Sequence, residues 1–554
     1  MKETIPNRIN ALRQSMERHG LQALYISGTD QHRSEYLSEH WQTRRFATGF
    51  TGSYGEVLIT AGHAGLWTDT RYFLQAEEEL HGTGVELHPL RVPHAVPVPE
   101  WLAANLDGGD GVGIDPFSLP LETWRQLSAH LSPKNIELVS SPYVLDEVWT
   151  DRPPLPAEPV FELPESVTGA SHLQKLEQIR EILRRKNGEM TVVTALDDLA
   201  WCYNLRGNDI AYNPVFYGFA IIGENTDLLF THLESIPESL KVKLGSMGVG
   251  LRPYHSFEQA LETFSGLSFY IDPLTMTYGH WNLLSGRNRL TEGTSIPCSL
   301  KSVKNEVELQ GWRKAMIQDG IAMTQFIGWL RERIKQPDLT EYEAGRKVAE
   351  FRSLREGFRG ESFPPIVGYG AHGAIVHFLV NKDNTGQVNP EGVLLIDSGG
   401  HYLTGTTDIT RTIAVGVVSA QQKRDFTLVL KGMIALSMAV FPEGTRGMHL
   451  DMLVRVALCR EGLNYGHGTG HGVGHYLCVH EGPASIRMEL NSEEIKAGMV
   501  FTNEPGLYRT GAYGIRTENM MVVVEKETTE FGRFLGFETL TLCPVDRKLI
   551  DISL

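Results

Sequence analysis

The chain has 554 residues, of which 41% are hydrophobic and 21% are charged, and this balance excludes a disordered protein. Its 67 acidic and 51 basic residues leave a net charge of -16, which argues against a nucleic-acid partner, because such a partner requires a basic surface. The sequence has no apolar run of the ~18–20 residues that span a bilayer, no signal-peptide pattern, and only five, widely spaced cysteines. We therefore expect a cytoplasmic protein with no membrane partner and about three or four domains.

Two similar arrangements of helix, strand and polar loop open the chain. Residues 9–28 have the apolar spacing of an amphipathic helix followed by a strand, and residues 173–196 repeat this order. A proline-rich segment, residues 151–167, lies between them and is expected to be a linker, since proline continues neither a helix nor a central strand. We predict a duplicated α/β module, with a first domain at residues 1–157 and a second at 158–301.

A third region, residues 302–554, combines helices with short strands. Residues 309–334 and 426–441 have helical spacing, and Thr340 with Glu343 fits a capping box at the start of another helix. Strands rich in branched residues lie between and after the helices, at VLLID, TRTIAVG, MVFTNE and NMMVVVE. This order predicts an α+β domain with helices over one curved sheet.

Four carboxylates lie at or beside these apolar strands. Asp397 ends one strand, Asp408 follows eleven residues later, Glu504 follows a third strand, and Glu518 lies within a fourth. The segment between the two aspartates is expected to form a tight hairpin, in which glycines with positive φ bring the carboxylates together. Singly, each acid would be an ordinary turn or strand-end residue. Four in one core need about four positive charges, or two divalent metals, because an unpaired buried charge is costly.

Glycine and histidine gather in residues 465–484. Glycine is in surplus, at 56 of 554 residues, and five of the 20 histidines lie within Met448–Glu481. His471 is at the centre of this stretch, where side chains in place of the glycines would keep backbone and imidazoles away from a metal. The P-loop, HExxH and GxSxG signatures do not occur, which removes the P-loop, ordinary zinc-protease and serine-hydrolase interpretations.

These motifs resemble the metal-dependent "pita-bread" peptidases, and specifically the long three-domain form of the Xaa-Pro aminopeptidase family. The resemblance covers nearly the whole chain and is carried by the ordered Asp, Asp, His, Glu, Glu set and by WTDTRYFLQA, LAWCYNLRGNDIAYNP, GYGAHGAIVHF, LLIDSGG, TTDITRT, GHGTGHGVGHYLCVHEGP, FTNEPGLY and GIRTENM. It implies two creatinase-like α/β domains followed by a pita-bread catalytic domain. It also implies hydrolysis of the N-terminal Xaa-Pro bond by a hydroxide held between two metals.

The resemblance implies a role for each member of the set. Asp397 would hold one metal, and Asp408 and Glu518 would bridge both. His471 and Glu504 would complete the second metal, and Glu504 would also accept and shuttle a proton. Oxygen ligands with one imidazole suit Mn²⁺, Co²⁺, Fe²⁺ or Zn²⁺, of which manganese is the expectation from the family.

Five further residues are implied to act on the substrate. His377 and His480 would stabilise the oxyanion or hold the substrate carbonyl. His467 would help to line the proline pocket. Arg516 would orient the acidic ligands, and Arg71, in the first domain, would lie near the substrate.

The implied partners are peptides with proline at the second position and a second copy of the chain. An Xaa-Pro bond is a tertiary amide without an N–H, so a shaped ring pocket and metal activation of water are one way to cleave it. Two alternatives stay open. Prolidase, which cleaves free dipeptides, shares the ligands but normally has one N-terminal domain. A non-catalytic peptide- or protein-binding protein on the same fold would be expected to lose ligands.

Overall fold

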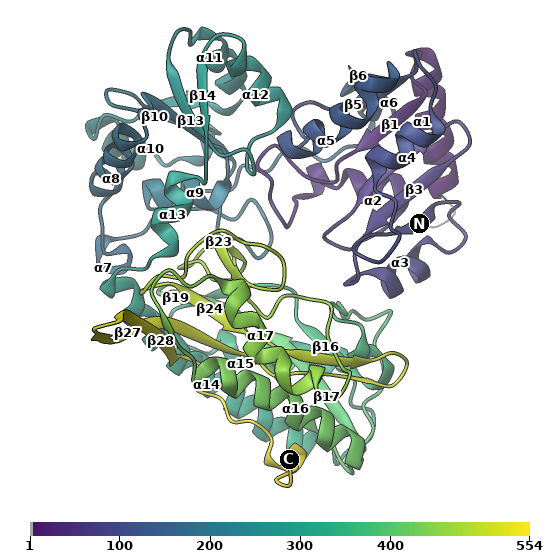
Figure 1. Cartoon of the computed structure of the whole chain (residues 1–554), viewed down its shortest axis with the longest axis vertical. Helices are drawn as coiled ribbons and strands as arrows, with labels where there is room; N and C mark the ends of the chain where they lie inside the picture. Colours follow the sequence, from purple (N-terminus) through teal and green to yellow (C-terminus); the bar gives the residue numbers. More distant parts are fainter. Residues whose placement is uncertain (1–3) are drawn as a thin grey trace. The chain divides into compact units, whose positions relative to one another are not determined.

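The computed structural model describes residues 4–554 and divides the chain into two compact units. The first comprises the chain up to Glu162 together with Ser171–Pro297, and the second comprises Leu163–Ala170 together with Cys298–Leu554. Figure 1 labels the elements of both units. The predicted domain boundaries after residues 157 and 301 stay predictions.

The first unit opens with a six-stranded sheet of order β4-β3-β2-β1-β5-β6. Its strands are β1 (Ala23–Ile26), β2 (Glu56–Thr60), β3 (Ala64–Thr68), β4 (Glu86–Pro89), β5 (Gly111–Ile114) and β6 (Glu137–Ser140). The accompanying helices are α1 (Ile5–Arg18), α2 (Thr43–Thr48), α3 (Phe73–Leu80), α4 (Val98–Asn105), α5 (Leu121–Leu131) and α6 (Tyr143–Val148). Leu24 and Tyr25 of β1 belong to separate apolar clusters, because alternate residues of a strand face opposite sides of its sheet. The sheet is therefore buried on both faces.

A second six-stranded sheet in the first unit repeats this topology, in the order β12-β11-β10-β8-β13-β14. Its strands are β8 (Met190–Val193), β10 (Gly218–Gly223), β11 (Asp227–Thr231), β12 (Gly250–Pro253), β13 (Ser268–Ile271) and β14 (Arg289–Glu292). Its helices are α8 (His172–Arg185), α9 (Leu196–Tyr203), α10 (Glu238–Ser246), α11 (Phe257–Thr263) and α12 (Tyr278–Ser285). In both sheets the first strand pairs antiparallel with one neighbour and parallel with the other. The predicted duplication of one α/β module is confirmed.

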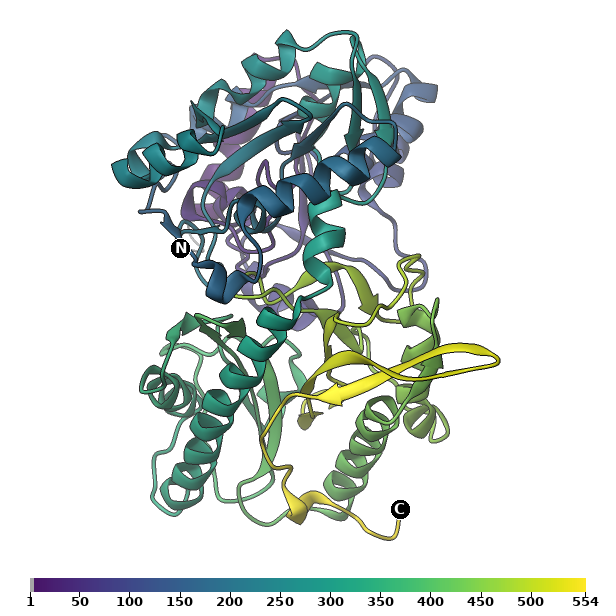
Figure 2. The same ribbon diagram turned by 90° about the vertical axis from the view of Figure 1, so that its left-hand side faces the viewer.

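Helices flank the strands of the second unit (Figure 2). They are α14 (Glu306–Arg333), α15 (Glu341–Ser353), α16 (Ala420–Ser437) and α17 (Gly447–Cys459). The unit also contains α7 (Glu165–Thr168) and the part of α13 (Ile296–Ser302) that follows Pro297. The Thr340 hydroxyl accepts a hydrogen bond from the Glu343 amide, as predicted for a cap. The Glu343 carboxylate binds Arg333 rather than the backbone, so the reciprocal half of the predicted capping box is wrong. None of the helices in residues 4–554 has both the length and the apolarity to cross a membrane.

The strands of the second unit form separate sheets, which corrects the prediction of one curved sheet. The sheets are β15-β18-β19, β16-β17-β20, β21-β28-β27-β24-β22-β23 and β25-β26. Their strands are β15 (Phe358–Glu361), β16 (Ile366–Tyr369), β17 (Val393–Ser398), β18 (Gly400–Tyr402), β19 (Gly405–Thr406), β20 (Ile409–Ala414), β21 (Val440–Pro442), β22 (Gly470–Gly472), β23 (Glu481–Ile486), β24 (Val500–Asn503), β25 (Gly506–Arg509), β26 (Tyr513–Arg516), β27 (Asn519–Thr529) and β28 (Gly532–Thr539). Between β20 and β26, the Thr412 hydroxyl binds both the carbonyl and the amide of Arg516. The Thr412 side chain thus takes the place of backbone hydrogen bonds at the seam between the β16-β17-β20 sheet and the β25-β26 sheet.

Separate apolar cores support the sheets of the second unit. Helices α14 and α15 contribute Phe326 and Val348 to a cluster with Leu394 of β17. Helices α16 and α17 contribute Leu436 and Val454 to another cluster, with strands of the six-stranded sheet. A third cluster includes Val393 of β17 and Ile515 of β26, so apolar packing as well as polar contacts joins the two sides of the seam.

Candidate metal centre

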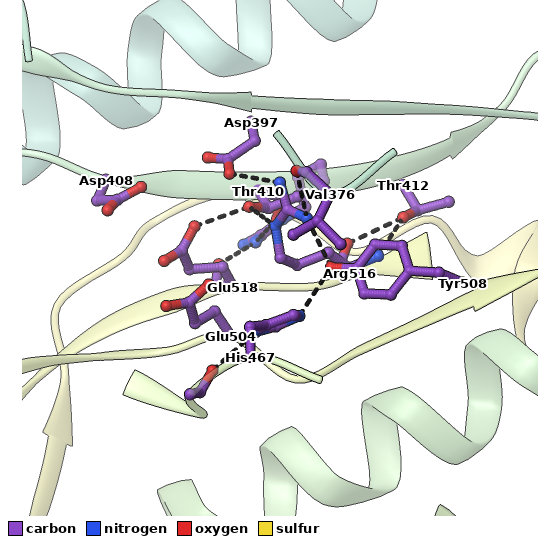
Figure 3. Close-up of polar contacts among 12 residues, drawn as sticks. Val376, Asp397, Asp408, Thr410, Thr412, His467, Glu504, Tyr508, Arg516 and Glu518 are labelled. Carbon is purple, nitrogen blue, oxygen red and sulfur yellow. Dashed lines mark hydrogen bonds and ion pairs between the residues drawn. The ribbon is translucent and has the colours of Figure 1, made fainter. Parts of the chain in front are cut away.

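The four predicted acidic ligands lie on one side of Arg516 (Figure 3). Asp397 is on β17, Asp408 immediately precedes β20, Glu504 follows β24, and Glu518 precedes β27. The fifth predicted ligand, the imidazole at residue 471, is central in β22. The structure thus brings together positions that are up to 121 residues apart in the sequence, namely 397 and 518.

His471 is in contact with two of these acids. Its Nε2 lies 3.4 Å from Oδ2 of Asp408 and 3.6 Å from Oε1 of Glu504. One ligand atom from each of Asp408, His471 and Glu518 lies within 4.8 Å of the other two. Nδ1 of His471 donates to the Gly472 carbonyl at 2.9 Å, so the ring directs Nε2 at the carboxylates, the orientation that a metal ligand needs.

The segment between the two aspartates forms the predicted tight hairpin, but its glycines have another purpose. Strands β17 and β20 are antiparallel neighbours, and between them β18 pairs antiparallel with β19 and also with β15. Positive φ does not occur at Gly399, Gly400 or Gly405. The reason for glycine is close approach, since a Cβ on Gly399 would lie 2.0 Å from the Thr407 carbonyl oxygen.

The acidic cluster is buried and short of positive charge. Arg516 donates from Nη2 to Oδ2 of Asp397 at 2.6 Å, whereas Oδ1 of Asp397 is buried and makes no hydrogen bond within the described chain. Burial, partly offset by Arg516, raises the pKa of Asp397 to about 6. Burial likewise raises the pKa of Glu504 to about 7, and burial with the charge of Asp408 raises the pKa of Glu518 well above its ordinary value.

This donor set fits a pair of divalent cations. Carboxylate oxygens with one imidazole match the preferences of manganese, iron, cobalt and zinc. Burial opposes protonation of His471, but the hydrogen bond to Asp408 and the charge of Glu504 outweigh it and raise its pKa to about 9. Without metal, the protonated ring therefore supplies positive charge to the same acids that a bound cation would neutralise. The unpaired Oδ1 of Asp397 is a further coordination position.

Arg516 is the centre of a hydrogen-bonded chain that crosses the site. Beyond Asp397, it donates from Nη1 to Oη of Tyr508 at 2.6 Å and from Nε to Oγ1 of Thr410 at 3.2 Å. Tyr508 is also 2.8 Å from Nε2 of His467, so one phenol links the histidine to the arginine. Sequence reasoning missed Tyr508. It lies on β25, where an aromatic residue is ordinary and gives no signal of a role in the site.

Thr410 is a second residue that sequence reasoning missed. Its hydroxyl donates to Oε2 of Glu518 at 2.8 Å, and it faces Asp397 in the strand register. A threonine in an apolar strand has no distinctive pattern. Only the pairing of β17 with β20, a tertiary feature, assigns it to the site.

The glycine-rich stretch places His471 by fitting β22 between β23 and β24. A Cβ on Gly470 would lie 2.0 Å from the Thr502 carbonyl oxygen, and one on Gly472 would lie 2.3 Å from the Glu481 carbonyl oxygen. The glycines are thus required by neighbouring backbone, a reason different from the predicted one, which was the approach of backbone and imidazoles to a metal.

The predicted substrate-binding histidines differ in their observed contacts. His480 is exposed, and its ring meets that of His471 edge-on, with centroids 4.3 Å apart. His377 is partly exposed and follows Val376, whose carbonyl accepts a hydrogen bond from Arg516 at 3.4 Å. Both therefore lie at the border of the acidic cluster.

Arg71 belongs to the first unit. Its guanidinium binds Asp69 through two hydrogen bonds, from Nε at 2.9 Å and from Nη2 at 3.0 Å. It also lines a pocket of that unit with Arg33, Arg44 and Glu56. Its expected place near a substrate stays a prediction.

Three family models match the chain. The model described as Metallopeptidase family M24 covers residues 310–525, which include all five candidate ligands. Two models described as Creatinase/Prolidase N-terminal domain cover residues 8–148 and 151–308.

Curated relatives align over nearly the full chain. A probable Xaa-Pro aminopeptidase P of Laccaria bicolor is 40% identical over 560 residues, which are 99% of this chain and 87% of the relative. Aminopeptidase P1 of Lotus japonicus is 36% identical over 618 residues, covering 99% of this chain and 93% of the relative.

Among solved structures, one matches the chain over its full length and others match only part of it. The X-prolyl aminopeptidase of Caenorhabditis elegans, described as a cytosolic enzyme with a di-nuclear active site, is 34% identical with a TM-score of 0.94, covering 99% of this chain and 92% of that one. A prolidase from Pyrococcus horikoshii is 22% identical with a TM-score of 0.52 and covers 68% of this chain and 99% of that one. The second likeness concerns the fold alone.

Proposed function

The chain belongs to metallopeptidase family M24, among relatives named Xaa-Pro aminopeptidase P, and from this premise we propose that it removes the first residue of peptides whose second residue is proline. The observation that supports this activity most directly is the set of four carboxylates and one imidazole within residues 310–525, of which Asp397, Asp408 and Glu518 are buried. The three-domain match over 99% of the chain favours an aminopeptidase over a prolidase. The protein is a metal-dependent peptidase.

Two divalent cations are its cofactor. Asp397, Asp408, His471, Glu504 and Glu518 would hold them. When bound, the cations supply Lewis-acid activation of water for attack on the scissile carbonyl. Manganese is the proposed metal, and metal analysis of protein purified without added metal tests it: an excess of zinc or iron over manganese would contradict it.

Glu504 is the proposed proton carrier. Its carboxylate lies 3.6 Å from Nε2 of His471, within the cluster where the attacking water would be activated. Its carboxylate accepts a proton from the attacking water and delivers it to the proline nitrogen that leaves. This delivery matters because the proline nitrogen of an Xaa-Pro bond carries no hydrogen of its own.

The histidines at the border of the site are proposed to bind the substrate. His377 and His480 donate hydrogen bonds to the carbonyl oxygen, where negative charge develops during attack. His467, held by Tyr508, lines the pocket for the proline ring. Arg516 orients Asp397 through its 2.6 Å hydrogen bond, and Arg71 is proposed to act near the first substrate residue.

A cytoplasmic location and a homodimer complete the proposal. The C. elegans relative is described as a cytosolic enzyme, which supports the location. The dimer rests on the resemblance to the family. Sedimentation equilibrium checks it: a mass of twice 61.8 kDa is expected, and a mass of 61.8 kDa at all concentrations would contradict it.

Hydrolysis of two peptides by the metal-reconstituted protein tests the activity. Release of free arginine from Arg-Pro-Pro is expected. Cleavage of Gly-Pro without cleavage of Arg-Pro-Pro would identify a prolidase instead. Hydrolysis of neither peptide with any divalent metal would favour a non-catalytic binding protein.

A further inference from the structure

A second cluster of metal-ligand side chains lies in the first unit, on strands β3 and β4. Strand β4 is the edge strand of its sheet and pairs parallel with β3, in a register that places Trp67 opposite His88 and Gly65 opposite Glu86. His63, two residues before Gly65, shares a face with it because alternate strand residues point the same way. His63, Glu86 and His88 therefore project from one face of two adjacent strands.

The ligand atoms of this cluster have the spacing of a single coordination sphere. Nε2 of His63 lies 3.2 Å from Nε2 of His88. One ligand atom from each residue lies within 4.8 Å of the other two. Two imidazole nitrogens on one tetrahedral zinc ion, each about 2.0–2.1 Å from it, are about 3.3 Å apart, which is close to the observed separation.

Aromatic neighbours hold both rings in this arrangement. His88 stacks on Trp67, with centroids 3.9 Å apart and an interplanar angle of 8°, and His63 stacks on Trp101, at 4.6 Å and 27°. A Cβ on Gly65 would lie 2.6 Å from Nε2 of His63 and 2.9 Å from Cδ2 of His88. Glycine at this position therefore leaves the space in which the imidazoles meet, and the site needs little rearrangement to bind an ion.

Glu86 is a charged neighbour of both histidines. Burial lowers the pKa of each imidazole, and the charge of Glu86 opposes that shift. Glu86 supplies a negative charge, and its side chain is 73% exposed, which leaves the site open to ions from solvent.

We propose that His63, Glu86 and His88 form a binding site for a borderline divalent cation of the zinc class. Two imidazoles with one carboxylate form a donor set typical of zinc sites that keep an open position. The ion would fasten the edge strand β4 to the loop before β3. Edge strands expose unpaired backbone groups, so this link would stabilise the β4 edge of the sheet. The inference does not rest on the proposed peptidase activity.

Zinc titration of the full-length protein tests this site. The titration uses Asp408→Ala as background, so that the catalytic centre contributes as little as possible. The background protein is expected to bind one zinc ion per chain that is lost, or at least tenfold weakened, in His63→Gln and His88→Gln. His81→Gln, which alters an exposed histidine of the same unit, serves as the matched control and should leave the binding unchanged. Equal zinc binding by all four proteins would overturn the proposal.

Two further measurements test whether the variants merely misfold and whether the two imidazoles merely share a hydrogen bond. Glu86→Gln changes an exposed side chain and should weaken zinc binding at unchanged thermal stability of the metal-free protein. Cobalt in the background protein should give the visible absorption of a tetrahedral site, and His88→Gln should lack it. If the two imidazoles only share a proton, cobalt will give no such spectrum in either protein, which would also overturn the proposal.

Discussion

The two oxygens of Asp397 have opposite surroundings. Oδ2 accepts a charged hydrogen bond from Arg516, whereas Oδ1 is buried and makes no hydrogen bond within residues 4–554. Three more carboxylates share this region with the same guanidinium. Because unneutralised buried charge is strongly unfavourable, the side chains alone indicate that cations complete the site.

Asp408→Ala should remove metal and activity together. The residue is proposed to bridge both cations, so its loss should lower the metal content and reduce kcat/KM for Arg-Pro-Pro by about a thousandfold or more. Metal analysis of the dialysed variant and steady-state kinetics check this. Glu527→Gln, an exposed acid on β27, is the matched control and should retain both. Full activity in Asp408→Ala would refute the ligand assignment.

The metal-free protein should become less stable as the pH rises. Its folded state raises the pKa of Asp397 from 3.8 to about 6 and that of Glu504 from 4.5 to about 7, so it favours their protonated forms. This stabilisation is complete below the ordinary pKa values and is lost as the pH rises through about 6 and about 7, a loss on the order of 3 kcal/mol for each group.

Thermal unfolding of chelated protein across this pH window measures the effect. The Tm should fall as the pH rises, and added divalent metal should reverse the fall. Glu504→Gln, which removes one titrating group, should show a smaller pH dependence. A Tm that rises with pH in the chelated protein would contradict the assignment of buried, unneutralised acids.

Tyr508→Phe should reduce activity without removing metal. The phenol contacts no proposed ligand directly, but it links His467 to Arg516 through hydrogen bonds of 2.8 and 2.6 Å. Loss of one such hydrogen-bonding group should lower kcat/KM about tenfold, mainly by releasing His467 from the proline pocket. Kinetics alongside metal analysis check this. Unchanged kinetics would show that the phenol has no positioning role.

At the scale of single elements, β22 is the tightest fit in the site. Gly470→Ala should destabilise the protein by about 1–3 kcal/mol, because the new Cβ would lie 2.0 Å from the Thr502 carbonyl oxygen. The displaced strand should also bind metal less well through His471. Gly468→Ala is the matched control, since its Cβ would approach no atom closer than 3.6 Å. Equal Tm values for the two variants would contradict this account of the glycines.

Helices, strands and the duplicated module were predictable because each depends on local patterns. The apolar spacing of residues 9–28 predicted α1 and β1, and the recurrence of that order predicted the second module. The reason for the glycines between Asp397 and Asp408 was not predictable. Gly399 approaches the Thr407 carbonyl, whereas Gly400 and Gly405 approach the rings of Phe358 and Trp312, and only the tertiary packing sets these neighbours.

In the acidic site too, the residues with a local sequence pattern were predictable, and those that depend on tertiary contacts were not. Four carboxylates beside apolar strands could be recognised, because strands disfavour acids unless something neutralises them. Thr410 and Tyr508 could not be assigned roles from ordinary strand positions. They join the site only where separate sheets meet, at a seam bridged by side chains rather than by a ladder.

At the scale of the whole molecule, the proposed functions occupy different units. All five proposed catalytic ligands belong to the second unit, whereas Arg71 and the proposed zinc site belong to the first. Mutations at His63 or His88 should therefore leave the catalytic metals in place. The most economical description is a peptidase unit joined to a duplicated α/β unit that carries a metal site of its own.

Anomalous diffraction from manganese-loaded crystals tests the central claim most directly. The account predicts two manganese peaks per chain, about 3.5–4 Å apart, bound by Asp397, Asp408, His471, Glu504 and Glu518. Asp408 and Glu518 should contact both peaks. A hydrolytically active crystal form with a single peak, or with none, among these five residues would contradict the dinuclear centre.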